Sequence, residues 1–173
     1  MNFYYIEILF YIIFFVSVFS FLSIAPWVPT FKKDLARVNS IVNIKKWEKF
    51  LEMWCWTATV SLFIAKNNPY SSVTAIELSP LLYLISKLRV YFSGLDNIEV
   101  IYWNALKLDL TKFDVIYVFW LPETVTKKIF PNLVKQISPS FRFISYCFQM
   151  KNDYFKETKH KEEKRYAIYE YKL

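Results

Sequence analysis

Residues 50–58 read Phe50-Leu51-Glu52-Met53-Trp54-Cys55-Trp56-Thr57-Ala58, and this stretch decides the fold class. Its first four residues, with Lys49 before them, form a short and mostly apolar run that is typical of a strand buried on both faces. A helical pattern follows over residues 58–66. A buried strand that leads through a short turn into a helix is the first half of a β–α–β unit, and such units build α/β proteins.

The same alternation of strand and helix continues along the chain. The patterns predict strands at 49–53, 72–76, 98–102, 113–119 and 141–148, helices at 58–66, 80–92 and 123–137, and a closing antiparallel strand at 166–171. We therefore expect a doubly wound, mostly parallel α/β sheet, whose ligands bind beyond the carboxyl ends of the strands. The charged run 151–165 is expected to be a solvated loop or a short helix.

Composition limits the function classes only in part. The 173 residues allow one domain and a short extra segment, and 55% are hydrophobic, which is ample for a core. The net charge of +7 suits an anionic membrane face, a nucleic acid or an acidic partner, without choosing among them. Cys55, Cys147 and the single His160 lie far apart, so neither a metal site nor a Cys/His catalytic pair is expected.

The N-terminal residues 3–24 form a long apolar run in which Glu7 is the only charge. This length matches the hydrocarbon core of a bilayer, and no basic region or small-residue cleavage site marks a secretory signal peptide. Basic residues begin at Lys32, which by the positive-inside rule places the following domain in the cytoplasm. We expect a single-pass transmembrane anchor at 1–25, a juxtamembrane segment at 26–46 with a helix capped by Thr30, and the main domain at 47–173.

Glycine is almost missing from this chain. Average usage of about 7% would give roughly 12 glycines, whereas Gly94 is the only one, and tryptophan occurs six times. Replacing Trp54 and Trp56 by glycine turns the opening stretch into FLEMGCGTA. The same replacement at Trp47, Trp103 and Trp120 restores a glycine at three further expected turns. Our hypothesis is that the codon UGA is read as glycine in the source organism, and the alternative is a degenerate, non-binding domain with true tryptophans.

With those glycines, residues 50–58 resemble the first motif of the class I S-adenosylmethionine-dependent methyltransferases: apolar residues, an acid, then G-x-G-x-G/A. The resemblance implies a Rossmann-like methyltransferase sheet and S-adenosylmethionine as the cofactor. It also implies that Glu52 belongs to the carboxylate network around the methionine ammonium, that Glu77 accepts hydrogen bonds from the ribose hydroxyls, and that Asn104 faces the adenine. The full set of expected cofactor-binding residues is Glu52, Trp54, Cys55, Trp56, Glu77, Leu78, Asn104 and Ala105.

A narrower resemblance comes from the apolar N-terminus, the A-P-W-V-P-T stretch at 25–30 and the L-P-E stretch at 121–123. Together they look like the membrane-associated protein-lysine methyltransferase family, whose animal members modify the ATP synthase c-subunit and the adenine nucleotide translocase. This resemblance implies a lysine acceptor on a membrane or membrane-associated protein, with the bilayer as a partner and neither nucleic acid nor metal. It places Pro122, Glu123 and Tyr146 on the substrate side as candidate catalytic residues, although Pro122 and Glu123 equally suit a helix start.

Other functions remain open. A methyltransferase for a quinone or lipid would share the cofactor motifs, and a non-catalytic membrane scaffold would have lost the cofactor site. An RNA acceptor is not expected, because the sequence lacks the interleaved aromatic and basic residues of single-strand binders.

Overall fold

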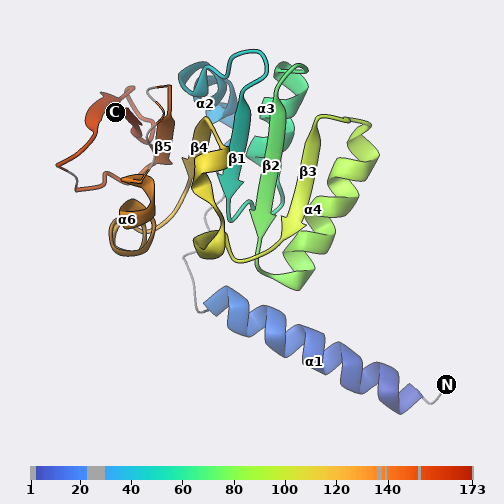
Figure 1. Cartoon of the computed structure of the whole chain (residues 1–173). Helices are drawn as coiled ribbons and strands as arrows, with labels where there is room; N and C mark the ends of the chain where they lie inside the picture. The colour runs from blue at the N-terminus through green and yellow to red at the C-terminus, as the bar shows by residue number, and fades with distance from the viewer. Residues whose placement is uncertain (1–2, 23–29, 136–137, 139, 152, 173) are drawn as a thin grey trace.

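The structure is a computed structural model that describes residues 3–22, 30–135, 138, 140–151 and 153–172. Its centre is a seven-stranded sheet with strand order β3-β2-β1-β4-β5-β7-β6. The strands are β1 Lys49–Met53, β2 Ser72–Glu77, β3 Ile98–Tyr102, β4 Val115–Val118, β5 Arg142–Tyr146, β6 Lys156–His160 and β7 Ile168–Lys172. The longer helices are α1 Phe3–Leu22, α2 Leu35–Val42, α3 Thr59–Asn67 and α4 Pro80–Ser93 (Figure 1).

The sheet confirms the expected α/β class. Strands β1 to β5 run parallel to one another, and β7 pairs antiparallel with β5, as the alternating C-terminal pattern predicted. Strand β6 contradicts the expectation of a loop or short helix over 151–165, because it pairs with β7 along the edge of the sheet. Its residues are mostly exposed, so no apolar alternation marks it, and main-chain pairing with β7 forms it instead.

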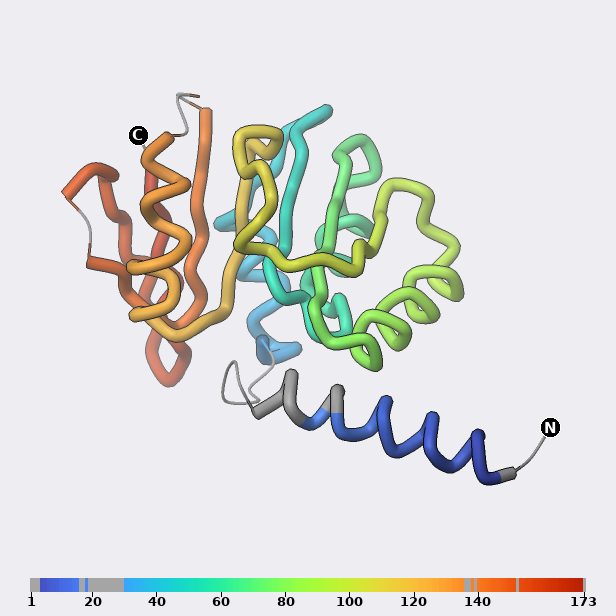
Figure 2. Tube along the Cα trace, turned by 60° about the horizontal axis from the view of Figure 1, so that its bottom comes forward, coloured from blue at the N-terminus to red at the C-terminus, as the bar shows by residue number. Residues whose placement is uncertain are grey.

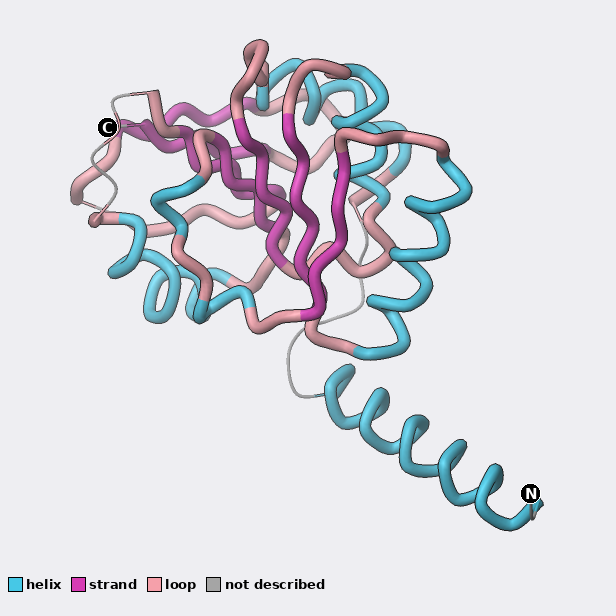
Figure 3. The backbone as a smooth tube through the Cα atoms, turned by 45° about the vertical axis from the view of Figure 1, so that its right-hand side comes forward, coloured by secondary structure: helices cyan, strands magenta, loops and turns pink. Residues whose placement is uncertain are grey.

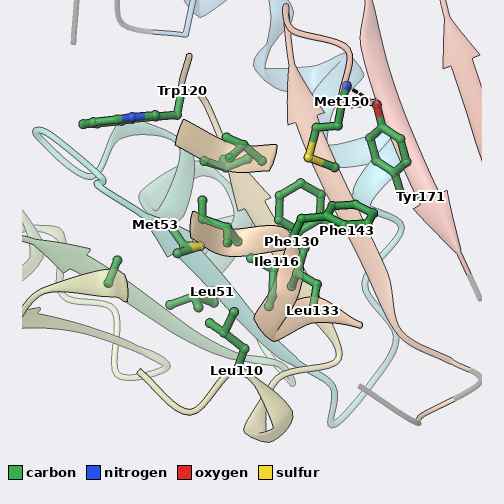
Figure 4. Close-up of a cluster of buried hydrophobic side chains, with 14 of the residues drawn as sticks. Leu51, Met53, Leu110, Ile116, Trp120, Phe130, Leu133, Phe143, Met150 and Tyr171 are labelled. Carbon is green, nitrogen blue, oxygen red and sulfur yellow. Dashed lines mark hydrogen bonds between the residues drawn. The ribbon is translucent and has the colours of Figure 1, made fainter. Parts of the chain in front are cut away.

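Both faces of the sheet are covered, which explains the nearly continuous apolar runs in its strands. On one face, Phe50 and Tyr117 pack with apolar residues of α2 and α3, and α4 lies over β2 and β3. On the other face, Leu51 and Ile116 meet the segment from Pro122 to Leu133 (Figures 3 and 4). This segment is α5 Pro122–Thr124, a π-helical turn at Val125–Ile129 and α6 Phe130–Leu133. It matches most of the helix expected at 123–137, whose last two residues lie outside the described ones.

Helix α1 corrects the expectation of a membrane anchor. The apolar N-terminal run does form a helix, Phe3–Leu22, and this helix contacts α4 beside the carboxyl ends of the strands (Figures 1 and 2). Within the described parts of the chain, no helix meets the length and hydropathy needed to cross a bilayer. The predicted transmembrane anchor and single-pass membrane localisation are therefore wrong: hydropathy alone does not separate a bilayer-spanning helix from an apolar helix that contacts its own domain. The 25–29 stretch lies outside the described residues.

Candidate active site

The first carboxylate of the site is Glu52, near the carboxyl end of β1. Its side chain points to the face covered by α3, where its Oε2 accepts hydrogen bonds from the Ser61 N–H at 2.8 Å and the Ser61 hydroxyl at 2.5 Å. Glu52 is only 6% exposed, and this burial raises its pKa to about 7 despite the two Ser61 bonds; Glu77 adds to the rise. Near neutral pH the carboxyl is therefore divided between its two protonation states.

The second carboxylate is Glu77, the last residue of β2, beside β1 in the sheet. Its Oε2 accepts the Trp56 N–H at 2.9 Å, and its Oε1 accepts the N–H groups of Leu78 and Ser79 at 2.9 and 2.8 Å. Burial raises the pKa of Glu77, and these three amide donors oppose the rise. Glu77 thus ties the loop after β1 to the start of α4.

The loop between the two carboxylates has an unusual backbone. Trp54, Trp56 and Ala58 have φ values of +54°, +55° and +53°, so every second residue lies in the left-handed region. The Cys55 N–H donates to the Ile76 carbonyl at 2.8 Å, which holds the loop against β2, and the Ala58 N–H donates to the Cys55 carbonyl at 2.7 Å within the loop. Left-handed backbone strongly favours glycine, because a Cβ atom clashes there. The loop therefore has the conformation expected of a G-x-G-x-G/A motif.

Two indoles fill the space beside this loop. The rings of Trp54 and Trp120 stack with centroids 4.3 Å apart, and the residues are 6% and 4% exposed. Trp120 follows β4, the neighbour of β1, and stands at the end of the core beyond Met53 (Figure 4). The cavity that remains around Glu52, Trp54 and Phe119 measures about 20 Å³. It has room for about one water, whereas small-molecule sites measure roughly 300–1,000 Å³.

The carboxylates therefore fit S-adenosylmethionine, but the free volume does not. The larger hollows, about 520 and 540 Å³, lie elsewhere: one at the amino ends of β1, β2 and β3 around Trp47 and Tyr70, the other around Asn43 and Arg142. Neither contains an expected site residue. Because open α/β sheets bind ligands at the carboxyl ends of their strands, we place the candidate site at Glu52 and Glu77.

The remaining expected cofactor residues lie at the ends of β2 and β3. The Trp103 N–H donates to the Glu77 carbonyl at 3.1 Å, which brings the β3 end beside the β2 end. The Asn104 Oδ1 accepts the Leu106 N–H at 3.0 Å and caps a short 3-10 turn, while Ala105 is buried beneath it. The structure thus gathers the expected cofactor residues at one edge of the sheet, although Asn104 uses its side-chain oxygen within its own turn.

The candidate catalytic residues are not brought together. Pro122 begins α5, and the Glu123 side chain is 85% exposed in an ion pair with Lys127 at 3.6 Å. Tyr146 is fully buried on the opposite face of the sheet, where its hydroxyl donates to the Asp34 carboxylate at 2.6 Å and its ring contacts Phe119. Burial and the Asp34 carboxylate raise the pKa of Tyr146. The catalytic roles of these three residues remain predictions.

Two polar residues of this region were not predicted from the sequence: Ser61 bonds Glu52, and Asp34 holds the Tyr146 hydroxyl. Thr30 was expected to cap a helix, but its hydroxyl instead shares a 2.7 Å hydrogen bond with the Tyr117 hydroxyl. Only Ser61 carried a local signal, since it lies in the first turn of the helix after the motif. Among the described residues, no three His, Cys, Asp or Glu side chains are placed to hold a metal ion.

Comparisons with known proteins now define the fold. No family model matches the chain. Over 109 residues it is 33% identical to a probable ribosomal RNA small subunit methyltransferase A of Methanosphaera stadtmanae; this match covers 62% of the chain and 35% of that protein. The chain therefore spans only about a third of this curated relative's length.

Two solved structures are similar over most of the chain. An RNA methyltransferase from Salinibacter ruber, in complex with S-adenosylhomocysteine, has a TM-score of 0.76 at 20% identity, covering 84% of this chain and 94% of its own. A dimethyladenosine transferase from Plasmodium falciparum has a TM-score of 0.66 at 20% identity, covering 84% and 62%. The chain thus has the class I S-adenosylmethionine-dependent methyltransferase fold. Other structures of this fold also hold S-adenosylhomocysteine, the demethylated form of the expected cofactor.

The comparisons also correct the expected partners. Two of these proteins are named for RNA and the third for dimethyladenosine. The exclusion of nucleic acid and the choice of a membrane-protein substrate are therefore wrong, and the membrane protein-lysine subfamily has no support. The exclusion relied on the absence of interleaved aromatic and basic residues, which is a signature of single-strand binding. Folded RNA is recognised through its shape and phosphates and needs no such pattern.

Proposed function

We propose that the protein is an S-adenosylmethionine-dependent methyltransferase that acts on RNA. One observation carries the proposal: Glu52 and Glu77, at the carboxyl ends of neighbouring parallel strands, flank a loop whose backbone alternates into the left-handed region. An acid before this loop and an acid at the end of the next strand are the two anionic groups that a cofactor with an ammonium and a ribose requires.

Each residue has a definite task in this proposal. The Glu52 carboxylate accepts the cofactor's ammonium, and Ser61 holds that carboxylate in place through its two hydrogen bonds. Glu77 keeps lone pairs beyond its three amide contacts and accepts the ribose hydroxyls. The bound cofactor supplies an electrophilic methyl group. The chain's own contribution is to hold that cofactor in a fixed orientation, so that an acceptor atom meets the methyl in line.

RNA is favoured as the acceptor on two grounds. Three of the similar proteins are named for methylation of RNA or of adenosine. The chain carries a net charge of +7, and cationic side chains gain affinity for a phosphate backbone by releasing its counterions.

Transfer of a labelled methyl group tests this proposal. The protein isolated from its source organism is incubated with methyl-labelled S-adenosylmethionine and total cell extract, and the product is divided between ribonuclease and protease treatment. We expect label that ribonuclease releases. E52Q and E77Q variants made in the source organism should lose transfer, whereas E163Q, made in the same way at an exposed position far along the chain, should retain it. Label released only by protease, or found in small molecules, refutes the RNA acceptor, and failure to bind S-adenosylmethionine refutes the methyltransferase.

A further inference from the structure

We infer that residues 47, 54, 56 and 120 are glycine in the protein as it is synthesised, and that the space filled by the Trp54 and Trp120 indoles is the cofactor pocket. The identity of the four residues is independent of the proposed function. The nature of the pocket's ligand rests on that function.

Backbone conformation carries the inference at three positions. Trp47, Trp54 and Trp56 have φ values of +72°, +54° and +55°. Bulky residues are genuine outliers in this region. One Asn, one Ala, one Cys and one Lys also have positive φ values. Of the five tryptophans that the structure describes, however, three have a positive φ. Such a concentration of the largest side chain in the conformation that glycine favours indicates that glycine belongs at these positions.

Trp47 shows that packing does not impose this conformation. It is the third residue of a turn closed by the Glu48 N–H donating to the Lys45 carbonyl at 3.1 Å, a position where turns with positive φ take glycine. Its side chain is 74% exposed, and its ring contacts are with Lys46 and Tyr70 at the surface. The turn therefore sets the φ angle of Trp47, and the surface contacts of the indole do not explain it.

Trp120 joins the set for a different reason, because its φ is ordinary. Its indole is buried against Trp54, and its Nε1 has no hydrogen-bond partner among the described residues. A buried N–H without a partner is costly, and native structures contain few. With glycine at both positions, the two ring volumes join the small cavity beside Glu52. The pocket then opens at the carboxyl ends of β1 and β4, where a ligand of this fold binds.

Trp103 marks the limit of the inference. It has an ordinary φ and is half exposed, so nothing in the structure requires glycine there. A single reassigned codon, UGA read as glycine, accounts for the four inferred positions together and raises the number of glycines from one, Gly94, to five.

Peptide mass spectrometry of the protein isolated from its source organism tests the four identities. Complete tryptic cleavage gives peptide 50–66, which contains both 54 and 56, and peptide 113–127, which contains 120. Partial cleavage to 46–66 adds position 47. We expect masses and fragment ions for glycine at all four positions. Tryptophan at any of the four positions overturns the inference.

A binding experiment then separates this inference from the proposed function. Calorimetry with S-adenosylmethionine compares the tryptophan-containing chain, a W47G/W54G/W56G/W120G variant and a W103G control. We expect the variant with four glycines to bind S-adenosylmethionine at least about tenfold more tightly than the other two proteins. Equal binding by all three overturns the pocket. Glycine in the native peptides, combined with a folded glycine variant that binds no S-adenosylmethionine, leaves the identities standing and refutes the methyltransferase.

Discussion

Substitution of Trp47 measures the cost of a side chain in the left-handed region. W47G and W47A both remove the indole and its contacts with Lys46 and Tyr70, so they differ only by a Cβ atom at a φ of +72°. That Cβ costs about 1–2 kcal/mol in left-handed backbone. Glycine's freedom in the unfolded chain opposes this by about 0.4–1 kcal/mol. W47G should therefore be the more stable of the two by roughly 1 kcal/mol.

Urea unfolding of matched pairs provides the assay. Urea titration gives the free-energy difference directly, and in thermal unfolding of the same variants 1 kcal/mol corresponds to a melting-temperature difference of about 2–4 °C for a chain of this size. The control pair is W103G and W103A, at a half-exposed position with ordinary φ, where alanine should be the more stable residue by roughly 0.4–1 kcal/mol. If alanine also proves at least as stable as glycine at position 47, the left-handed strain on which the glycine inference depends is refuted.

Three further predictions concern buried polar groups. Because burial holds the pKa of Glu52 at about 7 against an ordinary 4.5, its stabilising contribution is present below pH 4.5 and is lost as the pH rises to 7; E52Q should flatten that part of the urea midpoint–pH profile. The Glu48–Arg142 ion pair is 2.5 Å long, and both side chains are largely buried. E48Q should lower the free energy of unfolding by about 3 kcal/mol in urea titrations, because it leaves the Arg142 charge buried without its carboxylate partner. A loss below about 1 kcal/mol contradicts this prediction. Y146F removes the hydrogen bond to buried Asp34 and should cost about 1–3 kcal/mol in the same assay; if transfer activity falls while stability does not, Tyr146 belongs to the substrate side instead.

The strand and helix pattern was predictable from local sequence. Strands β1, β2, β4, β5 and β7 are mostly buried, and β3 buries only Ile98 and Val100. Burial requires apolar side chains at the strand period, so each of these strands left a visible run. Strand β6 was missed because an exposed edge strand forms by pairing with its neighbour and needs no apolar pattern. Hydropathy likewise identified α1 as a helix, but the sequence could not show that this helix contacts α4.

The candidate site likewise has features that the sequence predicted and features that only the structure revealed. The sequence located both carboxylates, because one β–α–β unit separates Glu52 from Glu77 and the carboxyl ends of adjacent parallel strands meet at one edge. It could not place Ser61 under Glu52 or Asp34 against Tyr146, since these contacts join separate elements.

The tryptophans show most clearly what the sequence determined and what only the tertiary structure determined. The sequence alone revealed the shortage of glycine and the expected turns at which tryptophan stands. Only the tertiary structure separated the positions that need glycine from Trp103, which does not. The reason is physical: the φ values of the turns depend on hydrogen bonds to other segments, such as that of Cys55 with Ile76. The stacking of Trp54 on Trp120 depends on β1 and β4, distant in sequence, being neighbours in the sheet.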